Sequence, residues 1–183
     1  MFKTHNPALL IIDCQKAIDV FSASERSNPS AETEIQLLLN VWRQKELPVV
    51  HIRHSSKSLE SPYHESKETY HFKSELRPKD EEVVVTKSEN CAFIGTNLTE
   101  VLSLSGIKEL VVCGVLTHHS VDATVRHASA IGYRVILPAN CTASFAIKLL
   151  CGDVVPAALV QDLFLANLNG EYCEVVQRVD FDC

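Results

Sequence analysis

Short apolar runs alternate along this chain with segments whose apolar residues recur every three or four positions. The first run, residues 8–12, is apolar at every position, which is typical of a strand buried on both faces of a parallel sheet. Residues 31–45 follow, with apolar side chains at helical spacing from Ile35 to Trp42. The chain therefore opens with a predicted strand and a predicted helix that packs against it.

The same alternation continues to the end of the chain. Further strands are predicted at residues 48–53, 83–86, 109–113, 133–137 and 172–176, and further helices at 97–105, 118–131 and about 156–168. Strands that alternate with helices imply right-handed crossovers and a parallel sheet. We therefore expect residues 1–183 to form a single α/β domain, a doubly wound sheet of about six parallel strands between helices.

One long segment, residues 54–82, interrupts this alternation. It is polar and carries few apolar side chains that could anchor it. A connection of this length is usually functional, as a lid or as an interface. The sequence favours neither of these two roles.

The composition argues against several classes of function. A net charge of −6 with no cluster of Lys or Arg disfavours binding to nucleic acid or to an anionic membrane surface. No run of about 18 apolar residues is present, and the amino terminus lacks the apolar stretch of a signal peptide. The seven cysteines include Cys14 and Cys113 inside apolar runs, which indicates buried thiols rather than a disulfide framework. We expect a cytoplasmic protein.

Three polar residues lie at or just beyond the carboxyl ends of predicted strands: Asp13, Lys87 and Ser120. Each alone has a structural explanation, as a turn residue, a solvated lysine or a helix cap. Parallel strands, however, bring their carboxyl ends to one rim of the sheet, where open α/β folds bind ligands. A carboxylate, an ammonium and a hydroxyl at one rim can form a nucleophilic site. The first strand is not followed by the glycine-rich turn of dinucleotide-binding folds, so no cofactor is expected.

Five segments in succession resemble the isochorismatase-like hydrolase superfamily, in particular its cysteine hydrolase and nicotinamidase-related branch. They are residues 8–15 (ALLIIDCQ), 48–55 (PVVHIRHS), 87–98 (KSENCAFIGTNL), 112–121 (VCGVLTHHSV) and 132–133, together with Thr124 and Arg126. They run in the family's order across nearly the whole chain. The resemblance implies a three-layer, Rossmann-like fold and hydrolysis of a C–N bond in a small amide or ureido substrate.

The resemblance also implies a role for each strand-end residue. Asp13 would shuttle protons as acid and base, Lys87 would hold the nucleophile in its reactive form, and residue 120 would be the nucleophile. The family places a non-proline cis peptide here between Val115 and Leu116. That bond would turn the backbone N–H of Leu116, together with that of residue 120, towards a developing oxyanion.

Further expectations follow from positions in the family. Phe93 and His119 would line the substrate pocket, with Tyr63 and Tyr70 from the long polar segment as further candidates. Core packing explains each of these side chains equally well. They would suit a small, flat or cyclic substrate that carries a carbonyl group. The metal ligands of nicotinamidases have no full counterpart after the second strand, so no metal is expected, and the family implies a homo-oligomer, either a dimer or a tetramer.

Ser120 stands where the family has cysteine. A thiol has a pKa of about 8.5, which a neighbouring lysine and a helix N-terminus can lower into the physiological range. A serine hydroxyl instead needs a general base that removes its proton during attack. Asp13 could act as that base. His119 is adjacent in the predicted helix, where neighbouring residues do not face each other.

Four explanations of Ser120 stay open. The serine is an engineered replacement of cysteine, or a natural nucleophile in a weak or altered hydrolase. Alternatively the chain is a pseudoenzyme that only binds a small molecule, or an isochorismatase-type enzyme in which Asp13 alone hydrolyses a vinyl ether. Against the last explanation, residues 117–121 (THHSV) look like the cysteine hydrolases with one atom exchanged.

Overall fold

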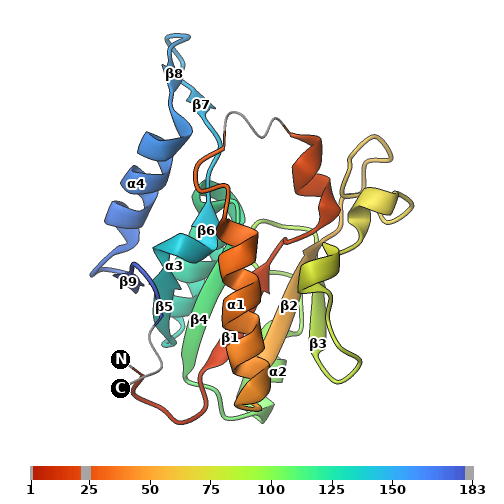
Figure 1. Ribbon diagram of the computed structural model, residues 1–183, viewed down its shortest axis with the longest axis vertical. Coiled ribbons are helices and arrows are strands. Elements are labelled where there is room, and N and C mark those ends of the chain that lie inside the picture. The colour runs from red at the N-terminus through yellow and green to blue at the C-terminus, as the bar shows by residue number, and fades with distance from the viewer. Residues whose placement is uncertain (1, 22–25, 180–183) are drawn as a thin grey trace.

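The computed structural model describes residues 2–21 and 26–179, and its centre is a parallel sheet (Figure 1). The predicted α/β architecture with a parallel sheet is confirmed. In spatial order the strands are β3 (Val83–Lys87), β2 (Val49–His54), β1 (Ala8–Ile12), β4 (Glu109–Val115), β5 (Arg134–Pro138) and β9 (Glu174–Val176), and a short seventh strand, β6 (Thr142–Ala143), pairs with the carboxyl end of β4.

Helices cover both faces of the sheet (Figure 1). Helix α1 (Ala31–Gln44) packs on one face, and α2 (Leu98–Leu104) and α3 (Asp122–Ala130) pack on the other, with α4 (Ala157–Leu168) beside α3. In β1, Leu10 and Ile12 join the core under α2 and α3, whereas Leu9 and Ile11 join the core under α1. Both faces of β1 are therefore buried, which explains why its sequence is apolar at every position.

The strand order places a topological switch point between β1 and β4. The chain leaves β1 towards β2 and β3, and it returns to add β4 and β5 on the other side of β1. In open α/β sheets, ligands bind outside the carboxyl ends of the strands at such a point. Asp13 follows β1 directly, and the segment that contains Ser120 follows β4.

The structure corrects the sequence-based elements where they are short. The helix expected at residues 118–131 begins later, because residues Thr117–Val121 form one turn of π-helix and α3 starts at Asp122. Among the described residues, four 3-10 helices and a small hairpin were not predicted, because none of these elements, at two to five residues, shows a continuous apolar run of strand length or a helical period. They are η1 (Lys16–Val20), η3 (Glu68–Tyr70), η4 (Ser74–Leu76), η6 (Ala139–Cys141) and the hairpin of β7 (Ile147–Lys148) and β8 (Val154–Val155).

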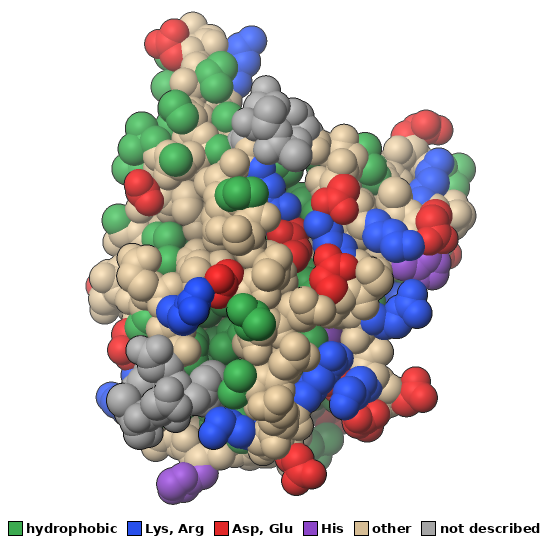
Figure 2. Space-filling model, in the orientation of Figure 1, with side chains coloured by type: hydrophobic (Ala, Val, Ile, Leu, Met, Phe, Trp, Pro, Cys, Tyr) green, Lys and Arg blue, Asp and Glu red, His purple; other side chains and the backbone are tan. Residues whose placement is uncertain are grey.

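Apolar side chains gather on the surface over α4 and the β7–β8 hairpin (Figure 2). A surface of this kind is typical of protein–protein contacts. Within the described part of the chain, no helix is long and apolar enough to cross a membrane. The exposed apolar residues of this surface are Leu149, Leu150, Val154, Leu159 and Leu163.

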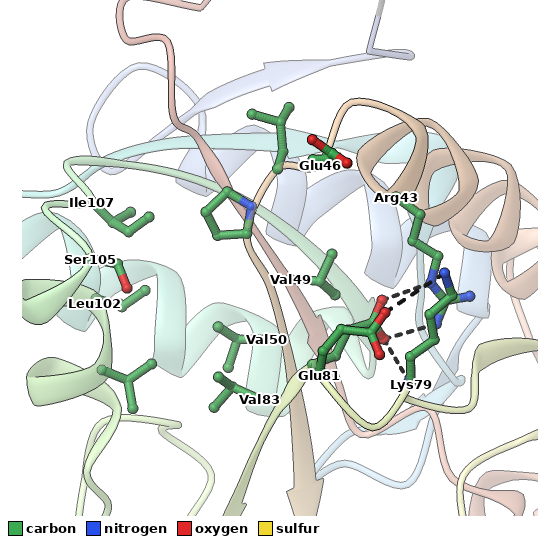
Figure 3. A pocket seen from close by; sticks show the side chains of 14 residues that line it. Arg43, Glu46, Val49, Val50, Lys79, Glu81, Val83, Leu102, Ser105 and Ile107 are labelled. Carbon is green, nitrogen blue, oxygen red and sulfur yellow. Dashed lines mark hydrogen bonds and ion pairs between the residues drawn. The ribbon is translucent and has the colours of Figure 1, made fainter.

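The end of the long polar segment is fastened to the sheet by Glu82. Its carboxylate accepts hydrogen bonds from Arg43, at 2.7 and 2.8 Å, from His51 Nε2 at 2.9 Å and from the Lys79 N–H at 2.9 Å. This cluster forms the charged wall of a cavity of about 540 Å³ at the amino ends of β2 and β3. Figure 3 shows Arg43 and Lys79 on this wall, opposite apolar side chains such as Leu102. Burial alone would raise the pKa of Glu82, but these hydrogen bonds outweigh it and lower the pKa to about 2.

Replacement of Glu82 by Gln is expected to destabilise the protein at pH 7, and the deficit should shrink in acid. A carboxyl group whose pKa is lowered by folding stabilises the folded state above its unfolded pKa, and that contribution is lost as the pH falls through the folded pKa. For Glu82 this window runs from 4.5 down to about 2. Urea unfolding of Glu82→Gln and the parent at pH 7 and pH 3 measures the difference. Glu81→Gln, at an exposed neighbour, is the control, and a Glu82→Gln deficit that stays constant with pH would contradict the assignment.

Gly114 lets β4 approach β1 closely. Its φ is +125°, and a Cβ atom there would lie 2.1 Å from the carbonyl oxygen of Ile12. No side chain fits without moving the backbone of β1, so glycine is required at this position.

Gly114→Ala is expected to cost roughly 3 kcal/mol or more of unfolding free energy, because backbone strain and a backbone clash add. Gly106→Ala is a matched control, since Gly106 also has a positive φ but nothing within 4 Å of the added Cβ. Its cost should be only about 1 to 2 kcal/mol. Urea unfolding compares the two variants, and equal losses would show that the contact with Ile12 is unimportant.

Candidate active site

The three strand-end residues meet at the carboxyl rim of the sheet. Lys87 Nζ donates a hydrogen bond to Asp13 Oδ2 at 2.7 Å and another to Ser120 Oγ at 3.1 Å. All three side chains are buried, with Lys87 only 2% exposed. One ammonium thus joins a carboxylate and a hydroxyl that are 107 positions apart in the sequence. The structure brings together the residues that the sequence analysis selected.

Asp13 is held in an unusual backbone conformation. Its φ is +54°, a region that Asp adopts more readily than most residues, and its N–H donates to the Ile52 carbonyl at 3.0 Å. This arrangement bends the chain away from the strand direction as soon as β1 ends. Of the two carboxylate oxygens, Oδ2 is taken by Lys87, while Oδ1 is buried and has no hydrogen-bond partner among the described residues. Oδ1 is therefore available to accept a proton.

Ser120 lies within the π-helical turn that follows β4. The peptide bond between Val115 and Leu116 is cis, and the Leu116 carbonyl accepts hydrogen bonds from the N–H groups of His119, at 3.1 Å, and Val121, at 3.2 Å. The hydrogen bonds of the turn therefore end at the carbonyl of Leu116, the second residue of the cis peptide. Ser120 Oγ is left pointing to Lys87, within the buried rim.

A buried glutamine, which the sequence analysis did not select, anchors this turn. Gln161 on α4 accepts hydrogen bonds from Thr117 Oγ1 at 2.7 Å and from Ser144 Oγ at 2.8 Å, and donates one to Thr142 Oγ1 at 2.8 Å. It joins the start of the turn to β6 and α4. The one signal in the sequence was a polar residue at an inward position of a mostly apolar helix, whose other polar residues, Asp162 and Asn167, are exposed.

A second buried glutamine, Gln15, holds the end of β2 in place on the other side of the Lys87–Asp13 pair from Ser120. Gln15 is fully buried, and its side-chain amide donates to the carbonyls of His54 and Tyr70 at 3.0 and 2.8 Å and accepts from the His54 N–H at 2.8 Å. It fixes the end of β2 to the long polar segment. As a result His54 Nδ1 lies 3.5 Å from Lys87 Nζ, and the His54 ring meets the Tyr63 ring edge to face.

A cavity of about 650 Å³ opens above these residues. Asp13, Ser120 and the cis peptide of Val115 and Leu116 lie at its wall, and five further polar side chains and five further apolar residues complete it. The polar ones are His54, Tyr63, Asn90, His118 and His119, and the apolar ones are Ile18, Phe21, Phe145, Ala146 and Ile147. A site of this size with mixed lining is typical of small-molecule binding.

Burial favours the neutral form of the histidines and the tyrosine that line the cavity. It lowers the pKa of His119, and it lowers the pKa of His118 to about 4, with a further contribution from His119. Burial and then the Lys87 charge lower the pKa of His54. Burial also raises the pKa of Tyr63. At pH 7 the neutral form of these four side chains is therefore favoured.

The four candidate pocket residues divide into two pairs. His119 and Tyr63 line the cavity. Phe93 instead stacks on His127 at 5.2 Å in the core under α3, and Tyr70 packs beneath the Arg53 guanidinium at 4.5 Å. For Phe93 and Tyr70 the packing explanation is the one that the geometry favours. His51, buried, is engaged with Glu82, and among the described residues no three His, Cys, Asp or Glu side chains form a group that could hold a metal ion.

The chain belongs to the isochorismatase family. The Isochorismatase domain model matches residues 7–150. A solved protein of this family from Chromobacterium violaceum has 41% sequence identity and a TM-score of 0.91, over 96% of this chain and 91% of its own. The uncharacterised isochorismatase family protein YrdC of Bacillus subtilis is 37% identical over 92% of this chain and 90% of its own length.

Relatives with named activities include a hydrolase and amidases. Streptothricin hydrolase of Streptomyces noursei is 33% identical over 83% of this chain and 61% of its own length. Nicotinamidase 3 of Arabidopsis thaliana is 27% identical over 75% of this chain and 73% of its own length. The fold and the family therefore define this protein as an isochorismatase-family hydrolase.

Substitutions at Lys87 and Asp13 are expected to change the free energy of unfolding non-additively. Lys87→Met leaves the Asp13 carboxylate buried without its countercharge, which should cost about 3 to 5 kcal/mol of unfolding free energy at pH 7. Adding Asp13→Asn to that variant removes the stranded charge, so the double variant should be more stable than Lys87→Met alone. Urea unfolding of the two single variants and the double variant measures the coupling. Losses that simply add would show that the two groups do not interact.

Proposed function

We propose that this protein hydrolyses a C–N bond in a small amide or ureido compound, with residue 120 as nucleophile. The contact that carries the proposal is the pair of hydrogen bonds from Lys87 Nζ, to Asp13 at 2.7 Å and to Ser120 at 3.1 Å, at the wall of a cavity. A nucleophile, a proton acceptor and a fixed positive charge are the parts that acyl transfer needs. The amide hydrolases among the relatives favour the same chemistry.

The reaction would proceed in two halves. Residue 120 attacks the substrate carbonyl while Asp13 takes its proton, and the backbone N–H groups of Leu116 and residue 120 stabilise the oxyanion that forms. The C–N bond breaks as Asp13 returns the proton to the departing nitrogen, leaving an acyl group on residue 120. Water then attacks this acyl group while Asp13 takes its proton. The bond from the acyl group to residue 120 breaks as Asp13 returns that proton to the side chain of residue 120, and the acid leaves.

Serine at position 120 makes the first half slow. Lys87 donates its hydrogen bond to Ser120 Oγ, so it can stabilise negative charge there but is not placed as the acceptor of the hydroxyl proton. The remaining proton acceptor in this cluster is Asp13, whose Oδ1 accepts no hydrogen bond from the described residues. A thiol at the same position would ionise far more readily beside the same ammonium.

Ser120→Cys is expected to raise amide hydrolysis by roughly 100-fold or more, since the thiolate does not depend on a base during attack. Ammonia release is measured over a panel of nicotinamide, carbamoyl and ureido compounds. Adding Asp13→Asn or Lys87→Met to the cysteine variant should abolish the gain. The folded fraction of each variant is measured as a control, so that a loss of activity is not mistaken for a loss of folded protein.

The alternatives give different results in the same assay. A vinyl-ether hydrolase that uses Asp13 alone would keep its activity in Ser120→Ala and lose it in Asp13→Asn. A pseudoenzyme would bind panel compounds saturably with no product in either the serine or the cysteine form. Equal turnover by the serine and cysteine forms would rule out residue 120 as the nucleophile.

A further inference from the structure

The cavity offers no free positive charge to a ligand. Histidines aside, Asp13 is the only acidic or basic residue among the described residues that line it. Lys87, which does not line the cavity, balances the charge of Asp13 through the hydrogen bond at 2.7 Å. Proteins that bind carboxylates normally supply Arg or Lys for the purpose. A carboxylate that entered here would lose its water and gain no countercharge.

The histidines do not supply that charge either. His54, His118 and His119 all line the cavity, and burial lowers the pKa of each. The His118 and His119 rings lie with their centroids 4.3 Å apart, so a proton on one would disfavour a proton on the other. At pH 7 this side of the cavity presents neutral rings.

Two basic side chains close to the segment that carries Ile18 and Phe21 are paired with carboxylates. Arg26 pairs with Glu32 at 2.7 Å, and Lys73 pairs with Asp19 at 2.6 Å and with Glu32 at 3.0 Å. Positions 22–25, next to Phe21, are Ser-Ala-Ser-Glu and contain no basic residue. Lys148 directly follows Ile147 in β7, but successive side chains of a strand point to opposite faces, and the exposed Lys148 does not line the cavity. Among the described residues, no lysine or arginine therefore lines the cavity.

The walls instead suit a flat, uncharged ring. Phe21 and Phe145 form a tilted pair with centroids 5.9 Å apart, and Tyr63 meets His54 edge to face at 5.4 Å. Aromatic side chains in these orientations pack well against a further ring. Ile147, at the start of the β7–β8 hairpin, extends the apolar side.

We propose that the cavity selects an uncharged, ring-bearing amide or ureide and excludes the same skeleton when it carries a carboxylate. The reacting bond comes from the proposed function, whereas the selection by charge depends on the cavity walls alone. Binding and hydrolysis therefore test the two separately.

The experiment compares benzamide with 3-carbamoylbenzoate, which has the same ring and amide and one added carboxylate. Dissociation constants are measured at pH 7 for the protein with Ser120 in place, and kcat/KM is measured for Ser120→Cys. We expect benzamide to bind at least about tenfold more tightly. The ratio should persist in 0.5 M salt, where the repulsion of anions by the net charge of −6 is screened.

A matched pair of variants places a cation in the wall. Ile147→Lys should lower the benzamide preference by about tenfold or more, and Ile147→Met, which keeps an apolar chain of similar length, should leave it unchanged. Phe21→Lys with Phe21→Leu repeats the comparison at a half-exposed position, in case the first pair is poorly folded.

Each outcome decides the proposal. A benzamide preference that falls in the lysine variants supports it. If no variant then hydrolyses benzamide or any compound of the amide and ureido panel, the proposed function fails while the charge selection stands. Equal or tighter binding of 3-carbamoylbenzoate overturns the charge selection, even if Ser120→Cys proves to be an amidase. Failure of both compounds to bind also overturns it.

Discussion

The hydrogen bonds of one buried ammonium hold the site together. Lys87 ends β3, yet its Nζ reaches past the end of β2 to Asp13 after β1 and to Ser120 after β4. Removing both charges from water costs several kcal/mol per ion, which their contact and the surrounding hydrogen bonds must offset. The site is therefore stable only while three strand ends keep their register. Its geometry is a property of the whole sheet.

The supporting residues act on the backbone at those strand ends. Gly114 allows β4 to lie against Ile12, so that the chain leaves β4 close to Asp13. Gln161 then fixes the turn that carries Ser120, and Gln15 fixes the segment that carries His54. Such contacts restrict where the reacting side chains can go, which is how a folded scaffold orients a site before a substrate arrives.

Sequence periodicity predicted the long elements because burial on two faces imposes it. Residues 8–12 are apolar throughout for this reason, and their strand forms where expected. The π-helical turn around Ser120 could not be predicted, since it is anchored by Gln161, which is distant in sequence. The sequence also could not separate Tyr63, a candidate from the long polar segment that lines the cavity, from Phe93, a candidate by family position that packs in the core. Both are aromatic side chains, and only tertiary packing distinguishes them.

The same geometry has different consequences for serine and for cysteine. An ammonium that donates to the atom at position 120 stabilises that atom as an anion. A thiol uses this stabilisation before the substrate arrives, because its pKa is close enough to neutrality for the thiolate to form. A hydroxyl can use it only during attack, while its proton moves to a base. Asp13 must then serve both as the countercharge of Lys87 and as that base. These two demands oppose each other, because protonating Asp13 weakens the ion pair that positions Ser120.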